Sequence, residues 1–294
     1  MQEEFFRGLL TNDLEESNII LLGIPYDEGC SCGKGASLAP KIIRELSSYL
    51  PPFTADGKSL NNIKLYDYKD VLEFSKIEDN FREILNFNKF NLVIGGDHSV
   101  SIPTQKAFLD YTKSLNKIPV LIHIDAHPDI CDFYDGSKYS HACTNMRAID
   151  NGYKTEDITL IGIRGYEEQE VIYLNQHKEL EVYNASYLNE NGFDETLKSL
   201  FNKYKNSDKH LVYLSYDIDA NDPSFAPGTG TPEAFGLNSI KLLNFIKELF
   251  INLPIKVMDI VEVSPSLDTN NITSWLALKT IYEIFGIIDN ERGK

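Results

Sequence analysis

Four short motifs that carry aspartate, histidine and glutamate are the part of this sequence best suited to chemistry. Carboxylate oxygens and imidazole nitrogens, with no cysteine among them, are ligands that suit Mn²⁺ or Mg²⁺, and two imidazoles favour Mn²⁺. The motifs therefore predict a metal site. They are Gly95-Gly96-Asp97-His98, Asp125-Ala126-His127-Pro128-Asp129, Ser215-Tyr216-Asp217-Ile218-Asp219 and Glu262-Val263-Ser264-Pro265.

Six side chains in these motifs are the candidate ligands. The three in the second motif alternate along the chain, and alternate side chains share one side of an extended strand. The four aspartates carry four negative charges, which two divalent ions would balance. Two ions roughly 3.5–4 Å apart lower the pKa of a shared water and make it a nucleophile. We therefore expect two Mn²⁺ ions per chain. The candidate ligands are His98, Asp125, His127, Asp129, Asp217 and Asp219.

Each of these residues also has an ordinary structural explanation. His98 could be a hydrogen-bonded loop histidine, and Asp217 or Asp219 could cap a helix or close a turn. The whole set favours metal binding, because burying so many carboxylates without a cation is very costly.

Each motif follows an apolar run that reads as a buried strand. Ligands of an open parallel sheet bind beyond the carboxyl ends of its strands, so four such ends would meet in one crevice. The runs are Asn91–Ile94, Ile118–Ile124, His210–Leu214 and Ile255–Val261.

The remaining segments continue an alternation of strands and helices along the whole chain. This pattern predicts one α/β domain over residues 1–294, with three layers (α/β/α) and a mostly parallel sheet covered on both faces. Further strands are expected at 18–24, 63–68, 158–163 and 180–183. Helices are expected at 41–49, 77–90, 101–115, 193–204, 237–253 and 275–287.

Composition excludes several classes of partner. A net charge of −16 argues against nucleic acid and against an anionic membrane surface. It is compatible with a small cationic substrate, although acidic surfaces also keep proteins soluble. No apolar run approaches the ~20 residues of a membrane helix, and the start lacks the features of a signal peptide. We expect a cytoplasmic enzyme with reduced thiols. Zinc bound by Cys30, Cys32, Cys131 and Cys143 is disfavoured, because the spacing lacks Cys-x-x-Cys pairs.

Taken together and in this order, the motifs resemble those of the ureohydrolases, the family of arginase and agmatinase. The resemblance implies a single α/β domain around an eight-stranded parallel sheet, and hydrolysis of a guanidino group to urea and an amine. It also implies a homo-oligomer, either a trimer or a hexamer. Besides the four motifs, it is carried by Gly33-Lys34-Gly35-Ala36, Ala39-Pro40, Arg44, Tyr139-Ser140-His141, Asp222-Pro223 and Gly228-Thr229-Gly230-Thr231-Pro232-Glu233.

The resemblance also implies a role for each site residue. Asp125 and Asp217 would bridge the ions, with His98 and Asp129 completing one and His127 and Asp219 the other. Glu262 would hold the guanidinium by charge and hydrogen bonds. Asp129 would orient a metal hydroxide. His141 would pass a proton to the departing amine, although it could instead be a solvated loop histidine.

Agmatine is the expected substrate. Arginine-specific relatives place an asparagine for the substrate carboxylate where this chain has Cys131, and Tyr139–Ala142 looks like agmatinases. Phe235 and Asn145-Met146 depart from the family pattern and could reshape the pocket mouth. One of Glu167, Glu168 and Glu170 could meet a distal ammonium. The alternatives are hydrolysis of arginine or guanidinobutyrate, or a catalytically silent metal-binding member. A metal-dependent phosphoesterase is disfavoured, because no cluster of arginine or lysine lies near the motifs.

Overall fold

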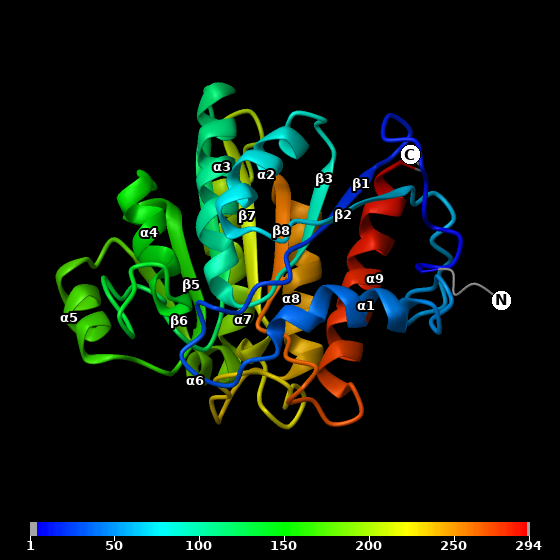
Figure 1. The fold of residues 1–294 in the computed structure, drawn as a ribbon. Coiled ribbons are helices and arrows are strands. Elements are labelled where there is room, and N and C mark those ends of the chain that lie inside the picture. The colour runs from blue at the N-terminus through cyan, green and yellow to red at the C-terminus, as the bar shows by residue number, and fades with distance from the viewer. Residues whose placement is uncertain (1–4, 293–294) are drawn as a thin grey trace.

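The computed structural model describes residues 5–292, and within them the chain folds around one sheet of eight strands. The strand order is β2-β1-β3-β8-β7-β4-β5-β6, and every neighbouring pair is parallel. Helices cover both faces (Figure 1), so the prediction of a three-layer α/β domain is confirmed. The strands are β1 Ile19–Gly23, β2 Leu65–Asp70, β3 Phe90–Ile94, β4 Ile118–Ile124, β5 Ile158–Ile163, β6 Glu181–Asn184, β7 His210–Asp217 and β8 Ile255–Val261.

The helices divide between the two faces of the sheet. They are α1 Ala39–Ser47, α2 Ile77–Leu85, α3 Ser101–Ser114, α4 Thr144–Asn151, α5 Glu168–Gln176, α6 Ala185–Tyr187, α7 Phe193–Tyr204, α8 Ser239–Asn252 and α9 Ile272–Arg292. One hydrophobic core joins the sheet to α1, α7, α8 and α9, and the other joins it to α2, α3 and α4. Successive strand residues alternate between these cores, as Ile19 and Ile20 do in β1. Because the central strands are covered on both faces, they read as continuous apolar runs.

Most predicted elements lie where the sequence placed them, but one predicted helix is wrong at its end. The bounds of β4, β5, β8 and α7 match the prediction. The helix expected over 77–90 stops at Leu85; Asn88 then adopts a positive φ of 54°, and Phe90 begins β3. The apolar pattern of a helix runs on into that of a following strand, so periodicity alone could not separate them.

Helices α4 and α5 were not predicted. The first turn of α5 is closed by a reciprocal capping box, in which the side chains of Glu167 and Glu170 each accept a backbone N–H of the other's position. Only Glu170 of this helix is buried. Because most of its residues contact solvent, the helix lacks an apolar face that the sequence could have revealed.

A tight turn after β3 places the first metal motif. A Cβ on Gly96 would lie 1.6 Å from the carbonyl oxygen of Tyr26, so only glycine allows this turn to pack against the loop after β1. Asp97 then accepts the backbone N–H of Gly29 at 2.7 Å, which ties the two loops together. None of the helices in the described part of the chain has the length and apolar character needed to cross a membrane.

Candidate metal centre and active site

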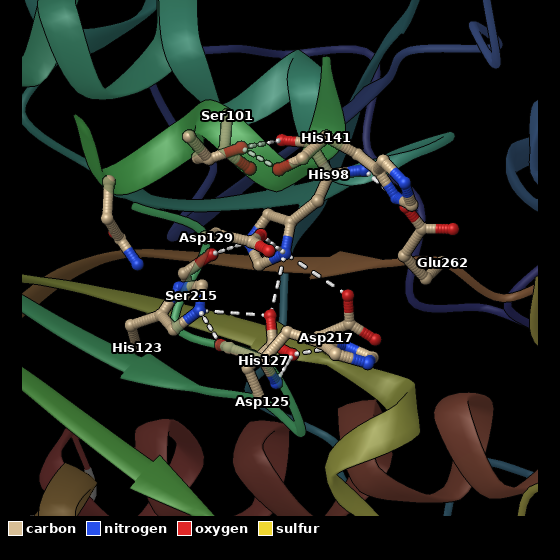
Figure 2. Close-up of polar contacts among 12 residues, drawn as sticks. His98, Ser101, His123, Asp125, His127, Asp129, His141, Ser215, Asp217 and Glu262 are labelled. Atoms are coloured by element: carbon tan, nitrogen blue, oxygen red, sulfur yellow. Dashed lines mark hydrogen bonds and ion pairs between the residues drawn. The ribbon is translucent and has the colours of Figure 1, made fainter. Parts of the chain in front are cut away.

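The six predicted ligands meet at the carboxyl ends of the central strands β3, β4 and β7, and Figure 2 labels all of them except Asp219. His98 points its Nδ1 atom into a ring of three carboxylates. The distances from Nδ1 are 3.0 Å to Asp125 Oδ2, 3.1 Å to Asp129 Oδ2 and 3.1 Å to Asp217 Oδ2. His98, Asp125 and Asp217 are at most 2% exposed and Asp129 is 5% exposed.

A second group of ligands shares Asp125 with the first. His127 Nδ1 lies 3.4 Å from Asp125 Oδ1 and 3.3 Å from Asp219 Oδ2. The nitrogen and oxygen atoms of these three residues are close enough to hold one ion. The geometry thus contains two adjoining sets of ligand atoms with one carboxylate in common.

The ligands meet at the strand ends as expected, but the expected alternation of side chains within a motif is wrong, because neither aspartate motif is extended along its whole length. Asp129 has a positive φ of 53°, and the backbone N–H of His127 donates to Asp125 Oδ1 at 2.6 Å. Asp219 lies in a 3-10 turn, and its N–H donates to Asp217 Oδ1 at 2.8 Å. Tight turns held by the ligands' own carboxylates therefore aim these side chains, and strand alternation does not.

Two buried atoms show that the donor set fits a cation. His98 Nδ1 and Asp125 Oδ2 make no hydrogen bond, although both lie in the middle of the cluster. Buried polar atoms rarely lack a partner, and a metal ion would supply one to both. Carboxylates and imidazoles, with no thiolate, match the ligand chemistry of Mn²⁺.

The buried carboxylates of the cluster would be stabilised by a positive charge placed among them. Burial, together with the charges of Asp219 and Asp125, raises the pKa of Asp217 well above its usual value. Burial would lower the pKa of His98, but the close approach of Asp125, Asp129 and Asp217 outweighs burial and raises the pKa. Among the described residues, protonated imidazoles are thus the only positively charged partners of these carboxylates.

His123 belongs to the site and was not predicted. Its Nε2 lies 2.9 Å from Asp125 Oδ2, and its ring stacks on that of His98 with centroids 4.8 Å apart. It is fully buried in β4, two residues before Asp125. A histidine inside an otherwise apolar strand was the available signal.

His141 and Glu262 form a second pair beside the metal ligands. His141 Nδ1 lies 3.0 Å from Glu262 Oε1, which also accepts the backbone N–H of His98 at 2.8 Å. His141 Nε2 lies 3.0 Å from Ser31 Oγ. Burial would lower the pKa of His141, but Glu262 outweighs it, with help from Asp129 and Asp97, and raises that pKa to about 9. Glu262 itself adopts a φ of 60°, a strained conformation of the kind found at functional sites.

A cavity of about 380 Å³ opens above the cluster, a volume that suits a small molecule. Three glutamates, Glu167, Glu170 and Glu233, line it, and no lysine or arginine does so among the described residues. The cavity wall is made by Ser31, Cys32, His127, Asp129, Tyr134, His141, Ala142, Tyr166, Glu167, Glu170, Asp217, Gly230, Thr231, Pro232 and Glu233.

Comparison with known proteins identifies this arrangement. A model of the arginase family matches residues 17–286. The chain belongs to the arginase family. It is therefore a ureohydrolase, a hydrolase of the guanidino group, and its clustered histidines and aspartates could hold a metal ion.

Similar proteins within the family act on more than one guanidino compound. An agmatinase of Neisseria gonorrhoeae is 34% identical over 280 residues, which cover 90% of this chain and 86% of that protein. A guanidinobutyrase of Pseudomonas aeruginosa is 31% identical over 289 residues, covering 94% and 88%. The crystal structure of a hypothetical agmatinase from Burkholderia thailandensis superposes with a TM-score of 0.85 at 26% identity, covering 99% and 92%.

Three residues expected to reshape the pocket mouth lie away from the cavity. Asn145 is fully buried; its N–H donates to the carbonyl of Asp129 and its side chain donates to that of Pro128, both at 2.8 Å. It thus supports the turn at Asp129, and the expectation that it shapes the pocket mouth is wrong. Met146, 9% exposed, is likewise absent from the cavity wall.

Phe235 lies at the protein surface, and the four cysteines lie outside the metal-ligand groups of the described residues. Phe235 is 87% exposed with a φ of 64°, and its side chain does not line the cavity. Cys131 is fully buried behind the wall. All four cysteines are free, and the metal-ligand groups among the described residues contain none of them.

Proposed function

We propose that this ureohydrolase binds two Mn²⁺ ions and converts agmatine to putrescine and urea. The observation that carries the substrate is the cavity wall, which presents carboxylates and no lysine or arginine among the described residues. Agmatine is cationic at both ends, so such a wall favours it over guanidino compounds whose other end carries a carboxylate. The similarity to agmatinases supports the same substrate.

The ligand atoms suggest how two ions would be shared. Asp125 and Asp217 would be shared by both ions, His98 and Asp129 would hold one, and His127 and Asp219 the other; the contacts of His98 and His127 support the sharing of Asp125. When bound, such a pair of ions lowers the pKa of water and so supplies a nucleophile near neutral pH. A guanidinium carbon requires this help because resonance makes it a poor electrophile.

His141 is the proton donor in this proposal. Its Nδ1 is held by Glu262, so its Nε2, beside Ser31 on the cavity wall, faces the substrate. A pKa raised to about 9 keeps the ring protonated at neutral pH. The imidazolium can therefore give its Nε2 proton to the departing amine, which cannot leave as an anion.

Glu262 is the residue proposed to hold the guanidinium. Its Oε1 is occupied by two N–H donors, whereas Oε2 accepts no hydrogen bond from any described residue. A buried carboxylate oxygen of this kind forms strong, charge-assisted hydrogen bonds to guanidinium N–H groups.

Among the glutamates of the rim, Glu167 is the best candidate for the distal ammonium. Glu170 is already occupied, because its two oxygens accept the N–H groups of Ile130 at 3.0 Å and Glu167 at 2.9 Å. Burial also raises the pKa of Glu170 to about 7, so it is only partly charged at neutral pH. The Glu167 side chain also accepts two hydrogen bonds, from the Glu170 backbone N–H and from the Tyr134 hydroxyl at 3.1 Å, but it lines the cavity and, unlike Glu170, is exposed. Glu168 does not line it.

Guanidinobutyrate is the second candidate, on the strength of the similarity to a guanidinobutyrase. Its tail is a carboxylate, and burying that group without a paired donor costs several kcal/mol. Cys131 stands where we expect arginine-specific relatives to have an asparagine. It is fully buried and does not line the cavity, so it offers no donor to a substrate carboxylate.

Urea release in the presence of Mn²⁺ tests the proposal across agmatine, arginine and guanidinobutyrate. We expect agmatine to exceed either rival in kcat/KM by at least roughly 10²-fold, or about 2.7 kcal/mol in transition-state binding. Glu167→Gln should reduce the ratio of kcat/KM for agmatine to that for its rivals. Glu168→Gln should leave this ratio unchanged, because Glu168 does not line the cavity. Equal values for agmatine and arginine would refute the substrate assignment and leave ureohydrolase chemistry intact.

A further inference from the structure

Asp259 is a buried carboxylate that the proposed reaction does not use. It lies in β8, three residues before Glu262, and it is fully buried. Within the described part of the chain, no lysine, arginine or histidine forms an ion pair with it. A carboxylate so placed needs hydrogen-bond donors around it, and it invites a functional explanation.

Four donors surround this carboxylate. Oδ2 accepts the hydroxyls of Ser101 and Tyr213, each at 2.6 Å. Oδ1 accepts the Ser215 hydroxyl at 2.7 Å and the backbone N–H of Tyr216 at 3.2 Å. An ionised carboxylate only accepts hydrogen bonds, so this set matches its charged form.

One of the four donors also touches a metal ligand. Ser215 Oγ lies 2.8 Å from His98 Nε2. Ser215 has one hydroxyl hydrogen, and Asp259 takes it, so the Ser215 oxygen must accept the hydrogen bond from His98 Nε2–H. That assignment leaves the His98 Nδ1 lone pair directed at Asp125, Asp129 and Asp217.

We propose that Asp259 is a positioning residue that acts through Ser215 to hold His98 in its metal-binding tautomer; this rests on the proposed metal-dependent function. Carboxylates that orient a histidine ligand make it a stronger base and fix its ring. Here a serine hydroxyl is interposed between the carboxylate and the imidazole. Ser101 and Tyr213 serve Asp259 itself and have no hydrogen bond to His98.

The chain provides a matched pair of variants for the test. Ser215→Ala and Tyr213→Phe each remove one hydroxyl donor from Asp259, but only the first breaks the connection to His98. Mn²⁺ binding is measured by calorimetric titration of the metal-free chain and by metal analysis, with electron paramagnetic resonance to distinguish paired from single ions. None of these readouts requires substrate.

In Ser215→Ala, we expect one of the two Mn²⁺ affinities to fall by roughly 10–100-fold, the usual loss on removing an outer partner of a ligand. The other affinity should stay within a few-fold of wild type, and the spectrum of paired ions should give way to that of single ions at limiting Mn²⁺. Tyr213→Phe should bind both ions as wild type does. Asp259→Asn should behave like Ser215→Ala; if it does not fold, the first pair decides.

Two results would overturn the inference: wild-type affinities in Ser215→Ala, or equal losses in Ser215→Ala and Tyr213→Phe, which would indicate a packing role alone. Failure of the wild-type chain to bind two ions would instead count against the proposed function. Binding of two ions without agmatine hydrolysis would count against the substrate and leave the role of Asp259 supported.

Discussion

Two groups of aspartates lie along the same sheet, and they are neutralised in different ways. Beside β2, Arg44 of α1 makes a two-pronged contact with Asp67, at 3.0 and 2.9 Å, and a further contact with Asp70 at 2.7 Å. At the ends of the central strands, Asp125, Asp129, Asp217 and Asp219 form no ion pair with any lysine or arginine of the described chain.

The difference separates a structural cluster from a functional one. Where the chain supplies its own guanidinium, the carboxylates are satisfied and the contact joins α1 to the edge of the sheet. Where it supplies imidazoles and leaves buried atoms without partners, the compensating charge is expected from bound ions. A buried acidic group is therefore informative about function only after its cations have been identified.

Removing metal should have the largest effect, and only on the central cluster. Chelation should reduce urea release to background, and Mn²⁺ should restore it better than Mg²⁺, because two imidazoles accompany the carboxylates. Activity is measured after dialysis against chelator and again after each metal is added. Full activity in thoroughly metal-free protein would contradict the reading of the central cluster as a metal site.

His141→Ala should separate proton transfer from metal binding. Loss of a proton-transfer group typically lowers turnover by about 10²–10⁴-fold. The Mn²⁺ content should remain that of wild type, because His141 contacts Glu262 and Ser31 and is not grouped with the metal ligands. Kinetics and metal analysis on the same preparation check both parts. An ion lost from this variant would make His141 a ligand.

Arg44→Ala should show what the other cluster contributes. It leaves the Asp67 side chain, which is 5% exposed, with only the exposed Lys69 as a cation, and breaking a buried pair costs about 3–5 kcal/mol of unfolding free energy. Denaturant titration measures the loss, and Mn²⁺ bound per folded chain should not change. Arg82→Ala is the control, because its pairs with Glu78 and Asp79 are exposed and worth at most about 1 kcal/mol. Similar losses in both variants would contradict the comparison.

The smallest effect is a shift in one pKa. Glu262→Gln removes the charge that raises the pKa of His141, so this pKa should fall from about 9 toward its ordinary value near 6.5. Because the folded pKa is raised, the pair stabilises the wild-type fold fully below about pH 6.5 and progressively less as pH rises through 9. NMR titration of the His141 ring in metal-free protein measures the change. An unchanged value would show that Glu262 is not its cause.

The sequence predicted the ligands better than it predicted their surroundings. Asp and His at the ends of apolar runs pointed to six candidate ligands that lie together in the structure, because a strand's apolar pattern and its end are local properties. The turns at Asp129 and Asp219, which actually aim the carboxylates, depend on backbone angles that residue spacing does not reveal.

The partners of the ligands could not be found in this way. His98 meets Ser215, and Ser215 meets Asp259, only because β7 and β8 are neighbours in the sheet. These residues are separated by 117 and 44 positions along the chain. Asn145 and the helix that carries it support the Asp129 turn from a segment whose composition resembles that of a loop.

The strand order also has a consequence for how the protein is made. Strand β8 lies between β3 and β7, which contact each other nowhere in the sheet, although β8 is the last strand to leave the ribosome. Until residues 255–261 emerge, β3, which precedes His98, and β7, which carries Asp217, lack their common neighbour. Strands β4 and β7 pair directly, so the group formed by Asp125, His127 and Asp219 does not depend on β8. The two groups of candidate ligands are therefore expected to form at different stages of synthesis, and the one that contains His98 waits for the last strand.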